Sequence, residues 1–149
     1  MAEPAGRVIE QFFVSLTARD WEALGRVLAP QVERIGPFGD QVVGRDRYLD
    51  LLMRTVPSEY RNDVLRITSS PDGRSGFARV TEHLQYPHQE LHLEETYCFD
   101  LDQTGLLSRI EIFWQTPESD PGGFGSATSD ESYRSSGAAG PDSSEVGPS

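Results

Sequence analysis

The stretch LHLEETYCFDLDQTGLLSRIEIFWQ, residues 91–115, decides the fold class of this chain. Apolar and aromatic residues recur along residues 91–101 and again along 106–115, as is typical of strands. The segment 102–105, Asp-Gln-Thr-Gly, has the composition of a turn. Two long strands joined by a short turn form an antiparallel hairpin, so this stretch predicts a sheet.

The strand pattern continues toward the N-terminus. Residues 64–69 and 75–86 predict two more strands, with turns at 71–74 and 87–90, so the second half forms an antiparallel meander. Before it, apolar residues at helical spacing predict helices over residues 5–18, 21–28 and 44–56, with Pro30 and Pro57 as helix stops and a short strand at 32–35. Helices followed by a meander favour an α+β fold in which the helices cover one face of a curled sheet.

The composition changes sharply near the C-terminus. Of the 33 residues from 117 to 149, 19 are Gly, Ser or Pro, and six are acidic against one arginine. Such a segment buries too little apolar surface to offset its loss of conformational entropy. We therefore expect one folded domain at residues 5–116 and a disordered acidic tail at 117–149.

The charge and the reactive residues exclude several classes of function. The net charge of −11 disfavours nucleic acid and anionic membranes as partners. No apolar run reaches membrane-spanning length, and no signal peptide is evident, so we expect a cytoplasmic protein. Cys98 is the only cysteine, which excludes an internal disulfide and a cysteine-based metal site. All 13 basic residues are arginine, which excludes Schiff-base chemistry on lysine.

Several segments together resemble the nuclear-transport-factor-2-like superfamily, in particular its SnoaL-like and ketosteroid-isomerase-like domains. They are ARDWEALGRVLAPQVERIGPFG, VGRDRYLDLL and YCFDLDQTGLLSRIEIFWQT, and the resemblance covers about residues 7–116. It implies a cone-shaped, curled antiparallel sheet with three N-terminal helices around a deep apolar pocket, often in a homodimer. It does not choose among isomerases, polyketide cyclases, epoxide hydrolases, dehydratases and non-catalytic binding modules.

The catalytic residues of two enzyme groups in this superfamily are replaced in this chain. The resemblance to ketosteroid isomerases aligns Phe12 with their helix tyrosine, Gly36 with their base aspartate and Tyr97 with their second acid. The resemblance to epoxide hydrolases aligns His83 with their arginine, and it aligns Gln85 and Ile112 with their two carboxylates. The resemblance therefore supports neither steroid isomerisation nor carboxylate-activated epoxide hydrolysis.

The same correspondence turns the odd-numbered residues of strand 75–86 toward the pocket. With a three-residue turn at 88–90, His83 then lies opposite Glu95, and Tyr97 and Arg79 share that face. We predict that His83 acts as general acid or base, that Glu95 orients it, and that Tyr97 or Arg79 stabilises an oxyanion. A purely structural His–Glu pair is the alternative interpretation. We expect no metal and no cofactor.

A second register stays open, because the even-numbered residues of this strand are the more apolar set. With a four-residue turn, Ala78, Val80, Leu84 and Tyr86 face the pocket, and Glu82 lies opposite Glu95. Two buried carboxyl groups at one site raise the pKa of one of them. In the first register Val80, Leu84, Tyr86, Cys98 and Phe113 instead form an exposed apolar stripe, which predicts a homodimer through the outer sheet face.

The pocket composition predicts a small apolar ligand. Its expected lining, beyond the four catalytic candidates, is Phe12, Trp21, Phe38, Asp40, Phe99, Ile112 and Trp114. We expect a cofactor-free isomerase, cyclase or dehydratase acting on a polyketide-like or steroid-like carbonyl compound. A non-catalytic ligand-binding or dimerisation module of the same fold is the alternative.

Overall fold

The computed structural model describes residues 4–115, which form three helices and one sheet. The predicted tail at 117–149 lies outside the described residues. No helix among the described residues is long and apolar enough to cross a membrane. The elements are α1 (Pro4–Ala18), α2 (Trp21–Arg26), β1 (Leu28–Ile35), β2 (Gln41–Val43), α3 (Arg45–Thr55), β3 (Glu59–Ser69), β4 (Ser75–Tyr86), β5 (Gln89–Leu101) and β6 (Leu107–Gln115).

The three predicted helices are present, but α2 is shorter than expected. The side chain of Asp20 caps it by accepting a hydrogen bond from the backbone N–H of Ala23, at 3.0 Å. The expectation that this helix runs to Leu28 and stops at Pro30 is wrong, because Leu28 already pairs with Leu107 in the sheet. Pro30 is instead part of β1, at an irregularity in the β1–β6 pairing where its missing N–H is tolerated.

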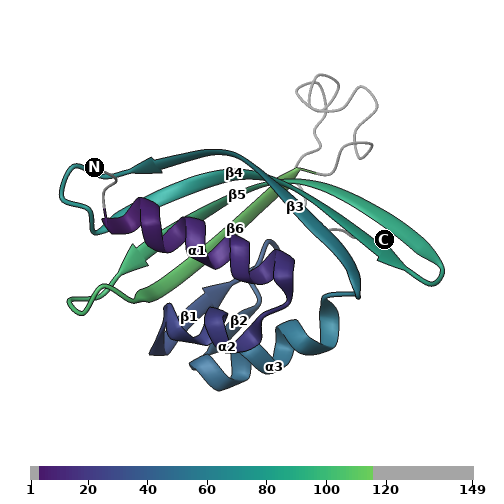
Figure 1. Ribbon diagram of the computed structural model, residues 1–149, viewed down its shortest axis with the longest axis horizontal. Coiled ribbons are helices and arrows are strands. Elements are labelled where there is room, and N and C mark those ends of the chain that lie inside the picture. Colours follow the sequence, from purple (N-terminus) through teal and green to yellow (C-terminus); the bar gives the residue numbers. More distant parts are fainter. Residues whose placement is uncertain (1–3, 116–149) are drawn as a thin grey trace, which may run out of the picture. The chain divides into compact units, whose positions relative to one another are not determined.

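The sheet has six strands in the order β2-β1-β6-β5-β4-β3 (Figure 1). Strands β3 to β6 form the predicted antiparallel meander, and the bounds of β4 match the prediction. Two features were not predicted from the sequence: β1 pairs with β6 in parallel, and the short strand β2 forms a hairpin with β1. The hairpin turn is closed by a hydrogen bond from the N–H of Gly36 to the carbonyl of Asp40, at 2.7 Å.

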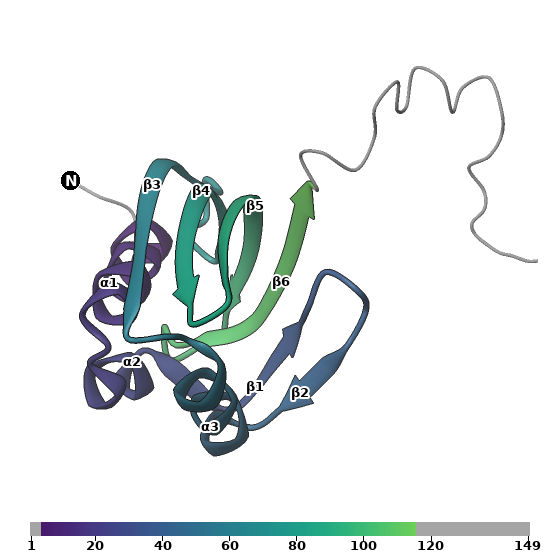
Figure 2. The same cartoon turned by 90° about the vertical axis from the view of Figure 1, so that its right-hand side faces the viewer.

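The sheet curls without closing, and the helices lie on its concave side (Figure 2). Helix α1 packs against β3, β4 and β5, and α3 packs against β1 and β2. The core between the layers holds residues from the helices and from every long strand, the largest of them being Tyr48, Phe12, Phe13, Phe99, Ile9, Leu24, Leu28, Leu107 and Ile110. The predicted α+β fold, a curled sheet roofed by three helices, is confirmed.

Candidate functional site

The connection between β4 and β5 determines which side chains face the concave side. Tyr86 pairs with Gln89, so the turn between the strands is only two residues long. In this register Val80 lies opposite Glu95, and Glu82 lies opposite Leu93. Val80, Glu82 and Glu95 are all buried, so the even-numbered residues of β4 share the inner face with the odd-numbered residues of β5.

The preferred register of the sequence analysis is therefore wrong. His83 pairs with His92 on the outer face instead of with Glu95, because the turn is two residues long and not three. Its Nε2 atom lies 3.3 Å from Asp63 Oδ2, and its ring meets that of His92 edge to face. Arg79 is exposed on the same outer face, opposite Thr96. Neither residue lines the inner cavity.

The second register has the correct face, although its pairing differs by two residues. Ala78, Val80, Leu84 and Tyr86 do face the helices. Glu82, however, lies opposite Leu93, so Glu82 and Glu95 are diagonal neighbours rather than direct partners. Side chains as long as glutamate can meet across such a diagonal.

A cavity of about 260 Å³ lies between the curled sheet and helices α1 and α3. Most of its wall is apolar, and a few buried polar groups interrupt it. Its lining residues are Leu16, Arg34, Pro37, Tyr48, Leu52, Thr55, Val56, Tyr60, Glu82, Leu84, Tyr86, Leu91, Leu93, Glu95, Tyr97, Ile112 and Trp114. Apolar walls with a small number of placed polar groups are typical of small-molecule sites.

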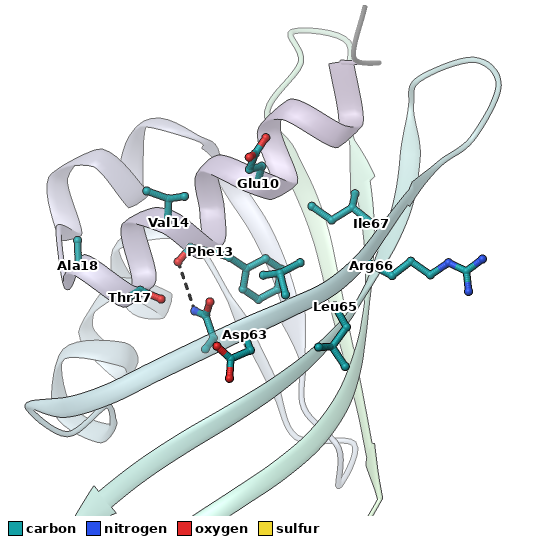
Figure 3. Close-up of a pocket in the computed structure, with 11 residues that line it drawn as sticks. Glu10, Phe13, Val14, Thr17, Ala18, Asp63, Leu65, Arg66 and Ile67 are labelled. Atoms are coloured by element: carbon teal, nitrogen blue, oxygen red, sulfur yellow. Dashed lines mark hydrogen bonds between the residues drawn. The ribbon is translucent and has the colours of Figure 1, made fainter.

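A larger hollow, of about 790 Å³, lies on the surface between α1 and the edge strand β3 (Figure 3). Phe13, Val14 and Ile67 supply much of its apolar lining, and its charged groups are Glu10, Asp63 and Arg66. These three charged residues are exposed. Chemistry that needs a desolvated acid or base is better served by the smaller, more enclosed cavity, which contains the buried carboxyl groups.

Glu82 is a buried hydrogen-bond acceptor in the wall of the smaller cavity. The hydroxyl of Tyr60 donates to its Oε2 atom, and the hydroxyl of Tyr97 donates to the same atom at 3.3 Å. Burial raises the pKa of both tyrosines, and the charge of Glu82 raises it further, so both hydroxyls stay protonated and able to donate. Donors of this kind stabilise the ionised form of a carboxyl group.

Glu95 has fewer hydrogen-bond donors around it than Glu82. Its side chain is 4% exposed, and no N–H or O–H donor of the described residues reaches its Oε1 atom. Burial, a hydrogen bond with Glu82 and the charge of Glu82 raise the pKa of Glu95 to about 10, although Arg34 acts in the other direction. At neutral pH Glu95 therefore keeps its proton.

Arg34 brings a positive charge to the wall of the cavity. Its Nη1 atom lies 2.6 Å from Asp40 Oδ2, while its buried Nε–H has no acceptor among residues 4–115. Burial raises the pKa of Asp40, but backbone hydrogen bonds and Arg34 outweigh it and lower that pKa below its usual value. A Cβ atom at Gly36 would lie 2.6 Å from Asp40 Oδ2 and 2.7 Å from Arg34 Nη1, so the ends of these two side chains would have to shift to make room for it.

The other predicted pocket residues divide into three groups. Glu95, Tyr97, Ile112 and Trp114 line the cavity as expected. Phe12 and Phe99 are buried in the aromatic core behind Tyr97 and do not line it, and Trp21 packs under Arg19 at 5.4 Å, away from it. Phe38 is 80% exposed with its ring edge-on to Trp114, and Asp40 is exposed in its pair with Arg34.

Three residues of the site, Tyr48, Tyr60 and Arg34, were not predicted from the sequence, and Glu82 was predicted there only in the second register. The greater apolarity of the even-numbered residues in β4 is the signal that would have placed Glu82 inside. No cluster of three or more His, Cys, Asp or Glu residues with metal-binding geometry is found within the described part of the chain.

Comparison with known proteins places this geometry among related structures. The SnoaL-like domain family matches residues 9–110. A proposed ketosteroid isomerase from Kribbella flavida DSM 17836 superposes with a TM-score of 0.68 at 22% identity, over 89% of this chain and 91% of that one. A proposed polyketide cyclase from Xanthomonas campestris pv. campestris gives 0.67 at 22% identity, over 77% and 93%.

A third similar structure is a Mycobacterium tuberculosis protein in complex with estradiol-17beta-hemisuccinate. Its TM-score is 0.69 at 14% identity, over 78% of this chain and 97% of that one. No match is found among curated protein sequences. At these identities the structural similarity concerns the fold alone.

Proposed function

The chain belongs to the SnoaL-like domain family, and on that premise we propose that its inner cavity binds a small, mostly apolar carbonyl compound and transfers a proton on it without a cofactor. The proposed acid–base pair is Glu82 with Glu95, whereas the sequence predicted His83 with Glu95. Similar structures include proposed isomerases and cyclases and a steroid complex, which supports an apolar ligand.

The proposal rests on one observation, which is that the two buried carboxyl groups have different surroundings. Glu95 holds its proton to a pKa of about 10, while Glu82 accepts from two tyrosine hydroxyls. Titratable groups whose environments push their protonation states apart are typical of acid–base sites. A cavity of about 260 Å³ is near the lower limit of the roughly 300–1,000 Å³ usual for drug-sized ligands, which favours a compact substrate.

The pair can serve both ends of an enolisation. Glu82 takes the proton from the carbon beside the carbonyl, and the electron pair of that C–H bond forms the new carbon–carbon double bond. The carbonyl oxygen becomes an enol oxygen because Glu95 gives it a proton. Glu82 then holds the proton taken from carbon, and Glu95 is left as a carboxylate. The free Nε–H of Arg34 is a further hydrogen-bond donor for that oxygen.

One observation favours a non-catalytic binding module instead. Glu82 already receives hydrogen bonds from two tyrosine hydroxyls without a ligand. Hydrogen-bonded buried polar groups also give conformational specificity to a core. A binding module would hold a compound in this cavity and leave its C–H bonds intact.

Proton exchange separates the two functions without a known substrate. Small cyclic ketones would be incubated with the protein in D₂O, and deuterium uptake beside the carbonyl followed by NMR. We expect uptake with the wild type, loss of at least about tenfold in Glu82→Gln and Glu95→Gln, and no loss in Glu90→Gln, which removes an exposed carboxylate. Ligand-induced shifts without any uptake would favour the binding module.

We further propose that the chain forms a homodimer through the outer sheet face, with a smaller apolar patch than the sequence suggests. Val80, Leu84 and Tyr86 belong to the inner face and not to the stripe. Phe77 and Phe113 are 45% and 50% exposed on the outer face, and Cys98 lies opposite Phe77. Large exposed aromatic side chains on a sheet face favour burial against a second copy.

A further inference from the structure

Asn62 lies beside the acid pair, on the strand next to that of Glu82. It is directly opposite Glu82 in the pairing of β3 with β4, and it is part-buried between the inner cavity and the surface groove. Its Nδ2 atom donates to the backbone carbonyl of Phe13 in α1 at 3.3 Å, the dashed line in Figure 3. The same atom donates to the hydroxyl oxygen of Tyr60 at 3.2 Å.

The carbonyl of Phe13 determines the direction of these hydrogen bonds. A carbonyl oxygen only accepts, so the end of the Asn62 amide that faces it must be the NH₂ group. The second N–H of that group then points to the Tyr60 oxygen. Because this oxygen already receives a hydrogen, Tyr60 directs its single proton elsewhere, and Glu82 is the acceptor within reach.

We propose that Asn62 is a positioning residue, which orients the Tyr60 hydroxyl toward Glu82 and thereby keeps Glu82 as the base and Glu95 as the acid of the pair. This inference rests on the proposed function only for its catalytic consequence. The Phe13 carbonyl fixes the Asn62 amide, the amide fixes the Tyr60 hydroxyl, and the hydroxyl donates to Glu82. It gives the two glutamates different surroundings, since no N–H or O–H donor of the described residues reaches Glu95 Oε1.

Two substitutions at Asn62 separate orientation from packing. Asn62→Asp keeps the shape of the side chain but replaces the donor with an acceptor, so Tyr60 turns its proton toward residue 62 and Glu82 loses a donor. Asn62→Leu removes the donor without offering an acceptor, so Tyr60 is free to keep its bond to Glu82. We therefore expect the larger effect from Asn62→Asp. Asp63→Asn, on the next residue of β3, is the matched control for a change of charge.

The readout is the ¹³C chemical shift of the two glutamate carboxyl carbons in the full-length chain, with no ligand present. In the wild type at neutral pH we expect one carbon typical of a carboxylic acid, from Glu95, and one typical of a carboxylate, from Glu82. In Asn62→Asp the two shifts move toward each other as the proton is shared more equally between the two carboxyl groups.

A background without the hydroxyl completes the test. In Tyr60→Phe there is no proton to orient, so adding Asn62→Asp moves the two carboxyl shifts much less than it does in the wild type. An Asn62→Asp effect of equal size in both backgrounds, or carboxyl shifts in Asn62→Asp that match the wild type, would overturn the positioning role. Shifts that follow the expectation without any deuterium uptake on ketones would keep the positioning role and exclude the proposed catalysis.

Discussion

Glu82 and Glu95 are diagonal neighbours on adjacent strands of one cavity wall, but their hydrogen-bond surroundings differ. Two tyrosine hydroxyls donate to Glu82, whereas Glu95 has a pKa raised to about 10. Because both carboxyl groups are buried, an ionised pair would be very unfavourable. One proton therefore belongs to the folded pair over the whole physiological range of pH.

This proton makes the stability of the fold depend on pH. The unfolded chain releases the Glu95 proton near its ordinary value of 4.5, while the folded chain keeps it to about 10. Between these values folding takes up a proton, so the free energy of unfolding falls as pH rises, by at most about 1.4 kcal/mol per unit. Urea unfolding from about pH 6 to about pH 9 should show this slope. Glu95→Gln should remove it and Glu90→Gln should retain it; equal slopes in all three proteins would exclude a protonated Glu95.

Glu82→Gln should lower the pKa of Glu95. It removes the charge and the carboxylate acceptor that hold the Glu95 proton, but burial, the largest cause of the shift, stays. The pKa of Glu95 should therefore fall below about 10 and stay above 4.5. A ¹³C titration of the carboxyl carbons measures it. Glu94→Gln, which removes the adjacent carboxylate on the opposite face of β5, is the control and should leave that titration unchanged.

The element types of this fold were predictable because their signals are local. A helical period gave α1, and a run of strands with short turns gave the meander, with β4 placed at its observed bounds. Asp20, directly before α2, has a residue type typical of an N-cap and does cap that helix. The parallel pairing of β1 with β6 was not predictable in this way, since Leu28 and Leu107 lie far apart in the sequence.

The site was harder to predict because it depends on the length of one turn. A change of one residue in the turn at Pro87 and His88 exchanges the inner and outer faces of β4. With the observed turn, His83 lies on the outer face and Glu82 on the inner face. The network around Glu82 also needs Tyr60 from β3 and Asn62 beside it, and no local pattern in β3 indicates which cavity its side chains reach.

His83→Ala tests the corrected register directly. His83 contacts Asp63 and His92 on the outer face and does not line the cavity. The variant should keep the Glu95 titration and the deuterium uptake on ketones within about twofold of the wild type, with a stability change below about 1 kcal/mol. Loss of uptake in His83→Ala, with Glu95→Gln still active, would return the acid–base role to the histidine.

The proposed dimer should depend on the two outer aromatic residues. Phe113→Glu and Phe77→Glu each place a charge in the face that the second copy would cover, which should weaken association by at least about tenfold. Sedimentation equilibrium measures the mass over a range of concentrations. Val14→Glu, at a side chain 57% exposed on α1, is the control and should leave association unchanged. A wild type that is monomeric throughout, or a Phe113→Glu variant that still dimerises fully, would contradict this interface.

Gly36→Ala should disrupt the ion pair at the wall of the cavity. The new Cβ atom would lie 2.6 Å from Asp40 Oδ2 and 2.7 Å from Arg34 Nη1, closer than real Cβ contacts allow, so the ends of these two side chains must shift and their ion pair weakens. We expect a loss of up to about 1 kcal/mol in the free energy of unfolding. The pKa of Asp40, which Arg34 helps to lower, should rise toward its ordinary value of 3.8.

A double-mutant cycle identifies the cause of that loss. In an Asp40→Ala background the carboxylate that the new methyl group would meet is gone, so Gly36→Ala should cost less than half as much there, as urea unfolding of the four proteins would measure. An equal cost in both backgrounds would assign the requirement for glycine to the hairpin backbone, where the N–H of residue 36 bonds the carbonyl of residue 40 at 2.7 Å. The smaller cost would show instead that this glycine is required because Arg34 and Asp40 meet across it, which leaves the Nε–H of Arg34 beside the acid pair.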